Sequence, residues 1–299
     1  MTTWQGIAGR RILITGATNG IGLAAAKELG RRGAQLAIVA RSRERADVAA
    51  RQIGGQVDVL VADLASQASV RRLAAEGLER YPRIDVLLNN AGAIYSRRQF
   101  TEDGIELTWA VNHLAPFVLT SLLLERLLAS EPARVITTAS EAHRVMPPFV
   151  SGSARVPFDD LRGDAAYGPL GLRRYGQTKL ANILFTLELA RRLQGSQVEA
   201  FCFHPGLVAS GFNRNNGSLI RLLMTLSRPF SRSPEQGADT LVWLADSAEP
   251  GGQSGGYFTD RHRASSSAAA QDAELARRLW ELSEEQTGSR PKPEIAPTL

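Results

Sequence analysis

Tyr175 and Lys179 are the two side chains whose types and spacing best suit proton-transfer chemistry. They stand four positions apart in a segment with helical periodicity, so they lie one turn apart on the same helical face. A tyrosine with an ordinary pKa of about 10 is a serviceable acid at neutral pH but a poor base. A lysine ammonium one turn away stabilises the phenolate and shifts the pKa of the tyrosine toward neutral pH. The alternative is that Tyr175 is an aromatic residue that packs on a loop at the helix start.

A glycine-rich turn near the beginning of the chain suits phosphate binding. The apolar run Ile12–Ile14 predicts a strand buried on both faces, and Leu23–Leu29 is rich in good helix formers. The glycines between them let a phosphate approach the main chain, and the helix dipole favours its negative charge. Taken alone, the pattern also fits an ordinary turn between a strand and a helix. The turn residues expected to bind a dinucleotide are Gly16, Thr18, Asn19, Gly20, Ile21 and Gly22.

Further strands recur at intervals of about 25 residues with helical segments between them, a pattern typical of a parallel sheet with right-handed crossovers. The strands after the first are expected at 34–40, 57–61, 84–88, 134–139, 198–203 and 255–259. The chain shows no internal repeat and no linker. We therefore predict an α/β protein in which residues 1–299 form a single-domain Rossmann fold: a doubly wound parallel sheet of about seven strands flanked by helices.

The end of the second strand bears on the choice of cofactor. An acidic residue there would hydrogen-bond the ribose 2′-hydroxyl of a dinucleotide, whereas an arginine accommodates a 2′-phosphate. Arg41 and Ser42 follow this strand directly, and there is no carboxylate at its end. Arg41 therefore favours NADP(H) over NAD(H). Arg43 and Arg45 are interpreted as solvated surface charges.

Polar residues also stand at the ends of later strands. Asp63, followed by Leu64, is expected either to cap the next helix or to hydrogen-bond the adenine. Asn112 lies within a helix predicted over 104–129, where an asparagine is unfavourable unless its side chain has a role. Ser140 ends the fifth strand. His143 is expected to make a structural hydrogen bond, although it could instead line a substrate pocket.

Two segments interrupt the regular alternation of strands and helices. Residues 144–174 hold four prolines and four glycines without sustained periodicity, and residues 207–232 contain apolar material that could close over a hydrophobic molecule. Loops of this length in a compact domain are usually functional. We expect both segments to cover the mouth of a site.

The composition excludes several kinds of partner. The net charge of +5 comes mostly from arginines spread along predicted helices, so no nucleic acid is expected. The single cysteine, Cys202, lies in an apolar strand, which predicts a buried thiol and a reducing compartment. The four histidines are too far apart for a local ligand motif, so no metal is expected.

The sequence also gives expectations about localisation. Its most apolar segment, Leu114–Leu124, is too short to span a bilayer, so no integral membrane segment is expected. The first residues lack the basic and apolar pattern of a signal peptide. These features predict a cytoplasmic protein.

Seven motifs occur in chain order, and together they resemble the short-chain dehydrogenase/reductase family. The motifs are Thr15-Gly-x-x-x-Gly-Ile-Gly22, Asp63-Leu64, Asn89-Asn-Ala-Gly92, Asn112, Ser140, Tyr175-x-x-x-Lys179 and His204-Pro-Gly206. The similarity runs from about Gly9 to Gly288. It is greatest to the retinol-dehydrogenase-like branch, which is also related to light-dependent protochlorophyllide reductases.

The resemblance implies a nicotinamide cofactor and assigns roles to four side chains. Tyr175 is the general acid/base, and Lys179 supports it while holding the nicotinamide ribose. Ser140 hydrogen-bonds the substrate oxygen, and Asn112 holds a water in a proton relay near Lys179. For Asn112, a structural role as a residue that bends the helix stays open. The other residues that the resemblance puts at the cofactor are Asn90, Ala91, Gly92, Pro205, Gly206, Val208 and Ser210.

These expectations define the predicted function. The chain is interpreted as an NADP(H)-dependent oxidoreductase that transfers a hydride between the nicotinamide and a small lipophilic carbonyl or alcohol. Two alternatives stay open: a C=C reductase of a conjugated or tetrapyrrole-like substrate, and a catalytically silent NADP-binding regulatory protein. The resemblance further implies a homo-oligomer, either a dimer or a tetramer.

Overall fold

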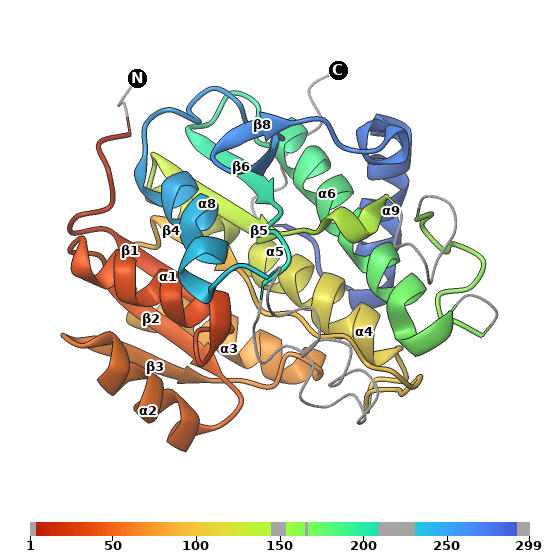
Figure 1. The fold of residues 1–299 in the computed structure, drawn as a ribbon, viewed down its shortest axis with the longest axis horizontal. Coiled ribbons are helices and arrows are strands. Elements are labelled where there is room, and N and C mark those ends of the chain that lie inside the picture. Colours follow the sequence, from red (N-terminus) through yellow and green to blue (C-terminus); the bar gives the residue numbers. More distant parts are fainter. Residues whose placement is uncertain (1–3, 145–153, 165–166, 209–230, 292–299) are drawn as a thin grey trace.

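The computed structural model describes residues 4–144, 154–164, 167–208 and 231–291. Within them, one sheet of eight strands has the order β3-β2-β1-β4-β5-β6-β7-β8, in which only β8 is antiparallel to its neighbour (Figure 1). The strands are β1 (Arg11–Thr15), β2 (Gln35–Ala40), β3 (Val57–Val61), β4 (Val86–Asn89), β5 (Ala133–Thr138), β6 (Val198–Phe203), β7 (Tyr257–Thr259) and β8 (His262–Ala264). The predicted doubly wound Rossmann fold is confirmed.

Helices cover both faces of the sheet (Figure 1). Helices α1, α2 and α8 contribute to the core on one face, and α3, α5 and α6 contribute to the core on the other. The helices are α1 (Gly20–Arg31), α2 (Arg43–Ile53), α3 (Gln67–Arg80), α4 (Leu107–Trp109), α5 (Ala115–Ala129), α6 (Leu172–Arg192), α8 (Pro234–Asp246) and α9 (Ala273–Thr287), with a π-helical turn at Ala110–Leu114 and short 3-10 turns at Glu141–His143, Pro169–Gly171 and Ala268–Gln271.

Strand β1 shows why the sheet is buried on both sides. Ile12 and Ile14 pack into the core under α1 and α8, whereas Leu13 packs into the opposite core under α3 and α5. All three side chains are fully buried. Because successive side chains of a strand point to opposite faces, a continuous apolar run predicts a strand of this kind.

Several predicted boundaries were wrong by a few residues, for identifiable reasons. The helix expected from residue 104 begins at Leu107, because the carboxylate of Glu106 accepts the main-chain N–H groups that start it. Helix α6 begins at Leu172, before Tyr175, directly after Gly171 in the left-handed conformation. The strand expected at 84–88 lies at Val86–Asn89.

The eighth strand was not predicted. Strands β7 and β8 are joined by a two-residue turn in which Asp260 and Arg261 both adopt positive φ, +50° and +63°. Such turns normally use Asn, Asp or Gly, because other residues are strained in the left-handed region. The Asp-Arg dipeptide therefore carries little of the usual sequence signal for a hairpin.

The apolar run expected at Leu114–Leu124 is part of a longer helical stretch, Leu107–Ala129. By length and composition this stretch could cross a membrane, but 89% of its most apolar window is buried inside the protein. Its main part, α5, packs on the sheet in the same core as α3 and α6. Its apolar composition is that of a core helix.

Helix α9 packs against the outer side of α6. The ring of Trp280 stacks on Phe185 with a centroid distance of 5.9 Å and meets the edge of Phe117 at 5.0 Å. At the end of α9, the side chain of Gln286 accepts a hydrogen bond from Trp109 Nε1 at 3.0 Å. Helix α9 therefore completes the core around the helical stretch 107–129.

His113, in the π-helical turn, is buried in this core. Its ring lies 4.7 Å from that of Trp109, and Nε2 lies 2.9 Å from Ser283 Oγ of α9. Burial lowers the pKa of His113 to about 3. The imidazole is therefore neutral at physiological pH.

We predict that His113 makes the protein sensitive to acid. Unfolded His113 takes up a proton near its ordinary pKa of about 6.5, but folded His113 does so only near pH 3. The unfolded chain thus binds more protons between these values, so stability falls as the pH falls. At about pH 5 the loss is about 2 kcal/mol. Chemical denaturation of His113→Gln at neutral pH and at about pH 5 should show a pH dependence smaller by this amount.

The exposed His262 of β8 provides the matched control. His262→Gln should keep the pH dependence of the parent protein. An unchanged pH dependence in His113→Gln would contradict the prediction.

Candidate active site

The residues predicted for cofactor binding gather at one edge of the sheet, because each group follows the carboxyl end of a parallel strand. In chain order they are the turn 16–22 after β1, Arg41 and Ser42 after β2, Asp63 and Leu64 after β3, 90–92 after β4, and 205–208 after β6. Strands β1 and β4 are neighbours although β2 and β3 intervene in sequence. The crevice between their ends is the topological switch point, where open α/β sheets bind ligands.

The glycine turn is locked to the segment after β4. Asn90 Nδ2 donates to the carbonyl of Thr15 at 3.0 Å, and Thr15 Oγ1 accepts the N–H groups of Asn90 and Ala91 at 3.1 and 3.0 Å. A Cβ on Gly22 would lie 2.3 Å from the carbonyl oxygen of Gly16 and 2.4 Å from Asn90 Nδ2. Only glycine fits at position 22. The side chain of Asn90 supports the turn, a role that sequence reasoning did not assign.

The start of α1 lies open beside this turn. Asn19 precedes the helix in an extended conformation, and its side chain makes no capping hydrogen bond. Thr18 lies in the turn and is partly exposed. Ile21 packs toward α8, where a Cβ on Gly237 would lie 3.2 Å from it. Helix N-termini of this kind suit anions, because their first N–H groups point outward.

Arg41 lies exposed at the end of β2 and makes no ion pair with the residues that the structure describes. Ser42 caps α2, since its Oγ accepts the N–H of Arg45. Arg43 pairs instead with Asp47 at 3.0 Å, one turn further along α2. The interpretation of Arg43 as a surface charge is confirmed.

Asp63 does not cap the next helix, so that alternative was wrong. Its carboxylate accepts the N–H of Ala65 at 3.0 Å within the turn after β3. Ser66 is the capping residue of α3, and its Oγ accepts the N–H of Ser69. Leu64 is partly buried against the core. The contact of Asp63 with adenine stays a prediction.

Ser140, Tyr175 and Lys179 come together behind the crevice. The side chain of Ser140 is hydrogen-bonded to the Tyr175 hydroxyl. Lys179 Nζ lies 5.4 Å from the centroid of the Tyr175 ring and donates to the carbonyl of Thr138 at 2.8 Å. A Cβ on Gly92 would lie 3.5 Å from the same Nζ, so the lysine reaches the segment after β4.

The protonation properties of the pair differ from expectation. Burial raises the pKa of Tyr175 to about 12, and the hydrogen bond with Ser140 opposes this increase. The expected lowering of this pKa by Lys179 was wrong. Burial also lowers the pKa of Lys179 to about 7. The protein interior disfavours the charged form of both groups, because each loses its hydration.

Asn112 lies in the π-helical turn and holds the segment after β4. Its Oδ1 accepts the N–H of Ala93 at 2.8 Å, and its Nδ2 donates to the Ala93 carbonyl at 2.9 Å and to Thr178 Oγ1 at 3.1 Å. Asn112 therefore joins three elements: the π-helical turn, the end of β4 and α6. This structural role differs from the helix-bending role that was left open, and the role of Asn112 in a proton relay stays a prediction.

The turn after Ser140 touches α6 closely. A Cβ on Gly176 would lie 2.6 Å from the carbonyl oxygen of Ala142. His143 is buried below the turn; its Nδ1–H donates to the Ser140 carbonyl at 2.6 Å, and its Nε2 accepts the N–H of Ser267 at 3.1 Å. The structural interpretation of His143 is confirmed, because both ring nitrogens are used inside the protein.

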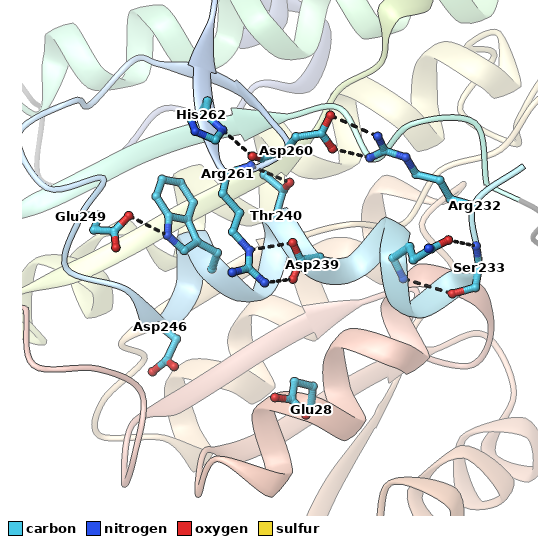
Figure 2. A network of polar contacts seen from close by, with 12 residues as sticks. Glu28, Arg232, Ser233, Asp239, Thr240, Asp246, Glu249, Asp260, Arg261 and His262 are labelled. Atoms are coloured by element: carbon cyan, nitrogen blue, oxygen red, sulfur yellow. Dashed lines mark hydrogen bonds and ion pairs between the residues drawn. The ribbon is translucent and has the colours of Figure 1, made fainter.

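The segment after β6 is held from two sides. Gly206 has φ of +83°, and a Cβ there would lie 2.7 Å from the Arg232 side chain. The N–H of Arg232 donates to the carbonyl of Leu207 at 2.7 Å, and its guanidinium pairs with Asp260 of the β7–β8 turn at 2.5 Å (Figure 2). Val208 packs against Gly237 of α8.

The same figure shows how the strained turn is stabilised. The guanidinium of Arg261 pairs with both carboxylate oxygens of Asp239 on α8, and its N–H donates to Thr240 Oγ1 at 3.2 Å (Figure 2). Both turn residues thus contact α8 or the chain that leads into it. These ion pairs fasten the β7–β8 hairpin to α8 and to Arg232, whose N–H is bonded to Leu207.

Sequence reasoning missed a fully buried ion pair beside Tyr175. Arg174 Nε donates to Glu106 Oε2 at 2.6 Å, and neither side chain is exposed to solvent. A signal for it exists in the sequence. Arg174 shares helical spacing with the buried residues Thr178, Ala181 and Phe185, which indicates an inward-facing arginine that needs a partner.

The two segments expected to cover the site are only partly described. Residues 154–164 pack into a core cluster with α6 and α9, through Val156, Phe158 and Leu161. Within the predicted coverage, residues 145–153, 165–166 and 209–230, the last including Ser210, lie outside the described residues. Coverage of the site therefore stays a prediction.

Cys202 is a core thiol, as predicted. It is fully buried in β6, and burial raises its pKa to about 12. Among the residues that the structure describes, no group of three or more His, Cys, Asp or Glu side chains could hold a metal ion.

Comparison with known proteins identifies the family. Residues 10–152 match the family described as short chain dehydrogenase. Retinol dehydrogenase 12 of Mus musculus is 42% identical over 294 residues, which cover 96% of this chain and 89% of that protein. A protein of Streptomyces sp. (strain C5) assigned as daunorubicin C-13 ketoreductase DnrU is 41% identical over 286 residues, 94% of each chain.

A solved structure agrees with these sequence relatives. The crystal structure of a short chain dehydrogenase from Burkholderia cenocepacia in complex with NADP has a TM-score of 0.67 and 26% identity, and the match covers 85% of this chain and 97% of that one. The sheet order, the glycine turn and the Ser140–Tyr175–Lys179 group are thus accompanied by similarity along nearly the whole chain. The chain belongs to the short-chain dehydrogenase/reductase family, in its retinol-dehydrogenase-like branch.

Proposed function

We propose that this protein is an NADP(H)-dependent oxidoreductase that transfers a hydride between the nicotinamide and a lipophilic carbonyl or alcohol. The observation that carries the proposal is the grouping of Ser140, Tyr175 and Lys179 beside the glycine turn at the switch point of the sheet. A proton donor, a hydrogen-bonding hydroxyl and a cation next to a dinucleotide crevice are the groups that reversible carbonyl reduction requires.

The crevice fits a phosphorylated dinucleotide. Gly16, Gly20 and Gly22 carry no side chains, so a pyrophosphate could approach the main chain of the turn at the start of α1. Arg41 is exposed and has no carboxylate partner among the described residues, and this suits a 2′-phosphate. The NADP complex of the Burkholderia cenocepacia relative supports the same choice.

The side chains of this site would transfer the proton that accompanies hydride transfer. Bound NADP(H) supplies or accepts the hydride. Tyr175, with a pKa of about 12, is protonated at neutral pH and donates to the oxygen of a carbonyl substrate. Ser140 positions that oxygen. Lys179, when charged, stabilises the phenolate that remains, and since its pKa is about 7 this charge is complete only in more acidic solution.

The relay water proposed at Asn112 would have to be held by an acceptor, because both N–H groups of the side-chain amide already have partners. Both polar atoms of the Asn112 side chain are already bonded to Ala93, and Nδ2 also to Thr178. The π-helical turn around Asn112 departs from the regular pattern of main-chain hydrogen bonds, and such turns are frequent at functional sites.

Two relatives support a lipophilic substrate. One is named a retinol dehydrogenase and the other a daunorubicin ketoreductase, and both names describe chemistry at an alcohol or ketone of a large, largely apolar molecule. We therefore propose retinoid-like or polycyclic ketones and aldehydes as the first substrates to test with NADPH.

Replacement of the Tyr175 hydroxyl should abolish turnover. Tyr175→Phe removes the proton donor, so kcat should fall by roughly a factor of 1,000, while the Kd of NADPH stays within about twofold. NADPH oxidation with a panel of lipophilic carbonyls measures kcat. Tyr81→Phe, at the far end of α3, is the matched control and should keep full activity. Retained turnover in Tyr175→Phe would refute the mechanism.

Removal of the Arg41 guanidinium should weaken NADPH binding selectively. Loss of a charge-assisted contact to a 2′-phosphate should raise the Kd of NADPH roughly tenfold or more, without affecting NADH. Fluorescence titration with both nucleotides measures this for Arg41→Ala. Arg45→Ala, another exposed arginine of the same segment, should bind like the parent. Equal affinity of the parent protein for NADPH and NADH would contradict the assignment of Arg41.

A methyl group on Gly176 should separate the two catalytic hydroxyls. In Gly176→Ala the new Cβ meets the Ala142 carbonyl in the turn that begins at Ser140. A displacement of about 1 Å should lower kcat roughly 100-fold. Gly77→Ala in α3 is the control, because its Cβ would have an ordinary contact of 3.5 Å with Leu123. If both variants turned over substrate equally, the close approach would not matter for catalysis.

A further inference from the structure

The ion pair of Glu106 and Arg174 is satisfied on all sides. Besides Glu106, the guanidinium of Arg174 contacts Gln177 Oε1 at 3.3 Å and the carbonyl of Leu161, and it lies 4.9 Å from the ring centroid of Trp109. Both side chains have zero exposure. Every contact of this guanidinium is thus made with the protein, and none is directed at the crevice.

Burial of two charges is an unusual means of stabilising this region. Removing charges from water opposes folding, and a buried pair can often be replaced by apolar side chains of similar volume without loss of stability. The surroundings here, with Trp109 and Leu161, could accommodate such side chains. What the pair adds beyond apolar packing is directionality, because the N–H groups of a planar guanidinium donate only along fixed directions.

The pair connects the two helices that carry the active site. Glu106 is the residue that caps the helix start; its Oε1 accepts the N–H of Thr108 at 2.8 Å and its Oε2 that of Trp109 at 2.9 Å. This stretch continues into the π-helical turn with Asn112. Arg174 immediately precedes Tyr175 in α6. The ion pair therefore fixes the spacing between the helical stretch of Asn112 and helix α6 at the residue that precedes Tyr175.

The first turn of α6 has no side-chain cap, although the N–H of Arg174 donates to the carbonyl of Tyr167 at 3.2 Å. Gly171 precedes it in the left-handed conformation and offers no capping side chain, and no acidic residue lies in the first turn. A Cβ on Gly171 would overlap the carbonyl of Tyr95, so this glycine admits close packing but cannot cap the helix. A helix start without a cap depends on tertiary contacts for its position.

We propose that the Glu106–Arg174 ion pair is a positioning element of the active site, which fixes the first turn of α6 and thereby holds the Tyr175 hydroxyl on Ser140. This inference rests on the proposed function. Arg174 and Glu106 are positioning residues, since neither touches a reacting atom. Their loss should impair kcat, which depends on the placement of Tyr175, more than it impairs binding at the distant glycine turn.

The test uses four variants of the full-length protein: Arg174→Met, Arg174→Lys, Glu106→Gln and the double variant Glu106→Gln/Arg174→Met. For each we would measure kcat and KM with a lipophilic carbonyl, the Kd of NADPH and the thermal midpoint, with kinetics at a temperature where the variant is fully folded. Each single neutralisation should lower kcat roughly 10- to 100-fold and leave the Kd of NADPH within about twofold.

The double variant separates positioning from stability. It leaves no lone buried charge, so its thermal midpoint should recover toward that of the parent, whereas its kcat should stay low. Arg174→Lys keeps the charge but loses the fork of donors, and its kcat should lie between those of the parent and Arg174→Met. Glu188→Gln, in the other half of the same helix, is the control; Glu188 pairs with Arg191 and Arg192, and its loss should lower the thermal midpoint without lowering kcat.

Parental kcat in the folded double variant would overturn the inference while leaving the proposed function intact. A drop in NADPH affinity parallel to the drop in kcat would also overturn it, because it would indicate general damage. A parent protein that binds NADPH but turns over no carbonyl or alcohol would overturn the proposed function, and the inference with it.

Discussion

The site depends on the hydrogen bonds that join the ends of β1 and β4. Thr15 and Asn90 tie two strands that are distant in sequence, and this contact brings Gly22 so close to Gly16 that no side chain fits between them. The cofactor crevice and the catalytic group lie around these hydrogen bonds. Asn112 extends them from the end of β4 to α6, and Gly176 brings α6 against the turn of Ser140. Each of these contacts depends on a glycine, which has no side chain, or on the side-chain amide of an asparagine.

Burial shapes the chemistry as much as position does. The surroundings that hold Tyr175 and Lys179 in place also exclude water from them, so the neutral phenol and the neutral amine are both favoured. A tyrosine that keeps its proton is suited to donating it, and a lysine with a pKa of about 7 changes charge within the physiological range. Burial is thus the largest influence on the pKa of both groups, and the surrounding residues contribute by excluding solvent.

Much of this arrangement could be predicted from the sequence, because it depends on local patterns. The apolar run of β1 predicts a strand buried on both faces, and the helix formers at 23–29 predict helix α1. Other features depend on partners far apart in the chain. Glu106 and Arg174 are separated by 68 positions, and the sequence around either residue does not indicate its partner. Likewise, the raised pKa of Tyr175 follows from tertiary burial, which the four-residue spacing to Lys179 does not reveal.

Helix α9 has a consequence for how the protein is made. It supplies Trp280 against Phe117 and Gln286 against Trp109, so the core around the helical stretch 107–129 is incomplete until residues 273–287 have been synthesised. A chain still growing on the ribosome presents this apolar surface without its cover, although the sheet strands β1 to β6 are already available. Closure of this core is thus a late step of folding. Over this interval, chaperone binding to the uncovered helices would compete with the docking of α9.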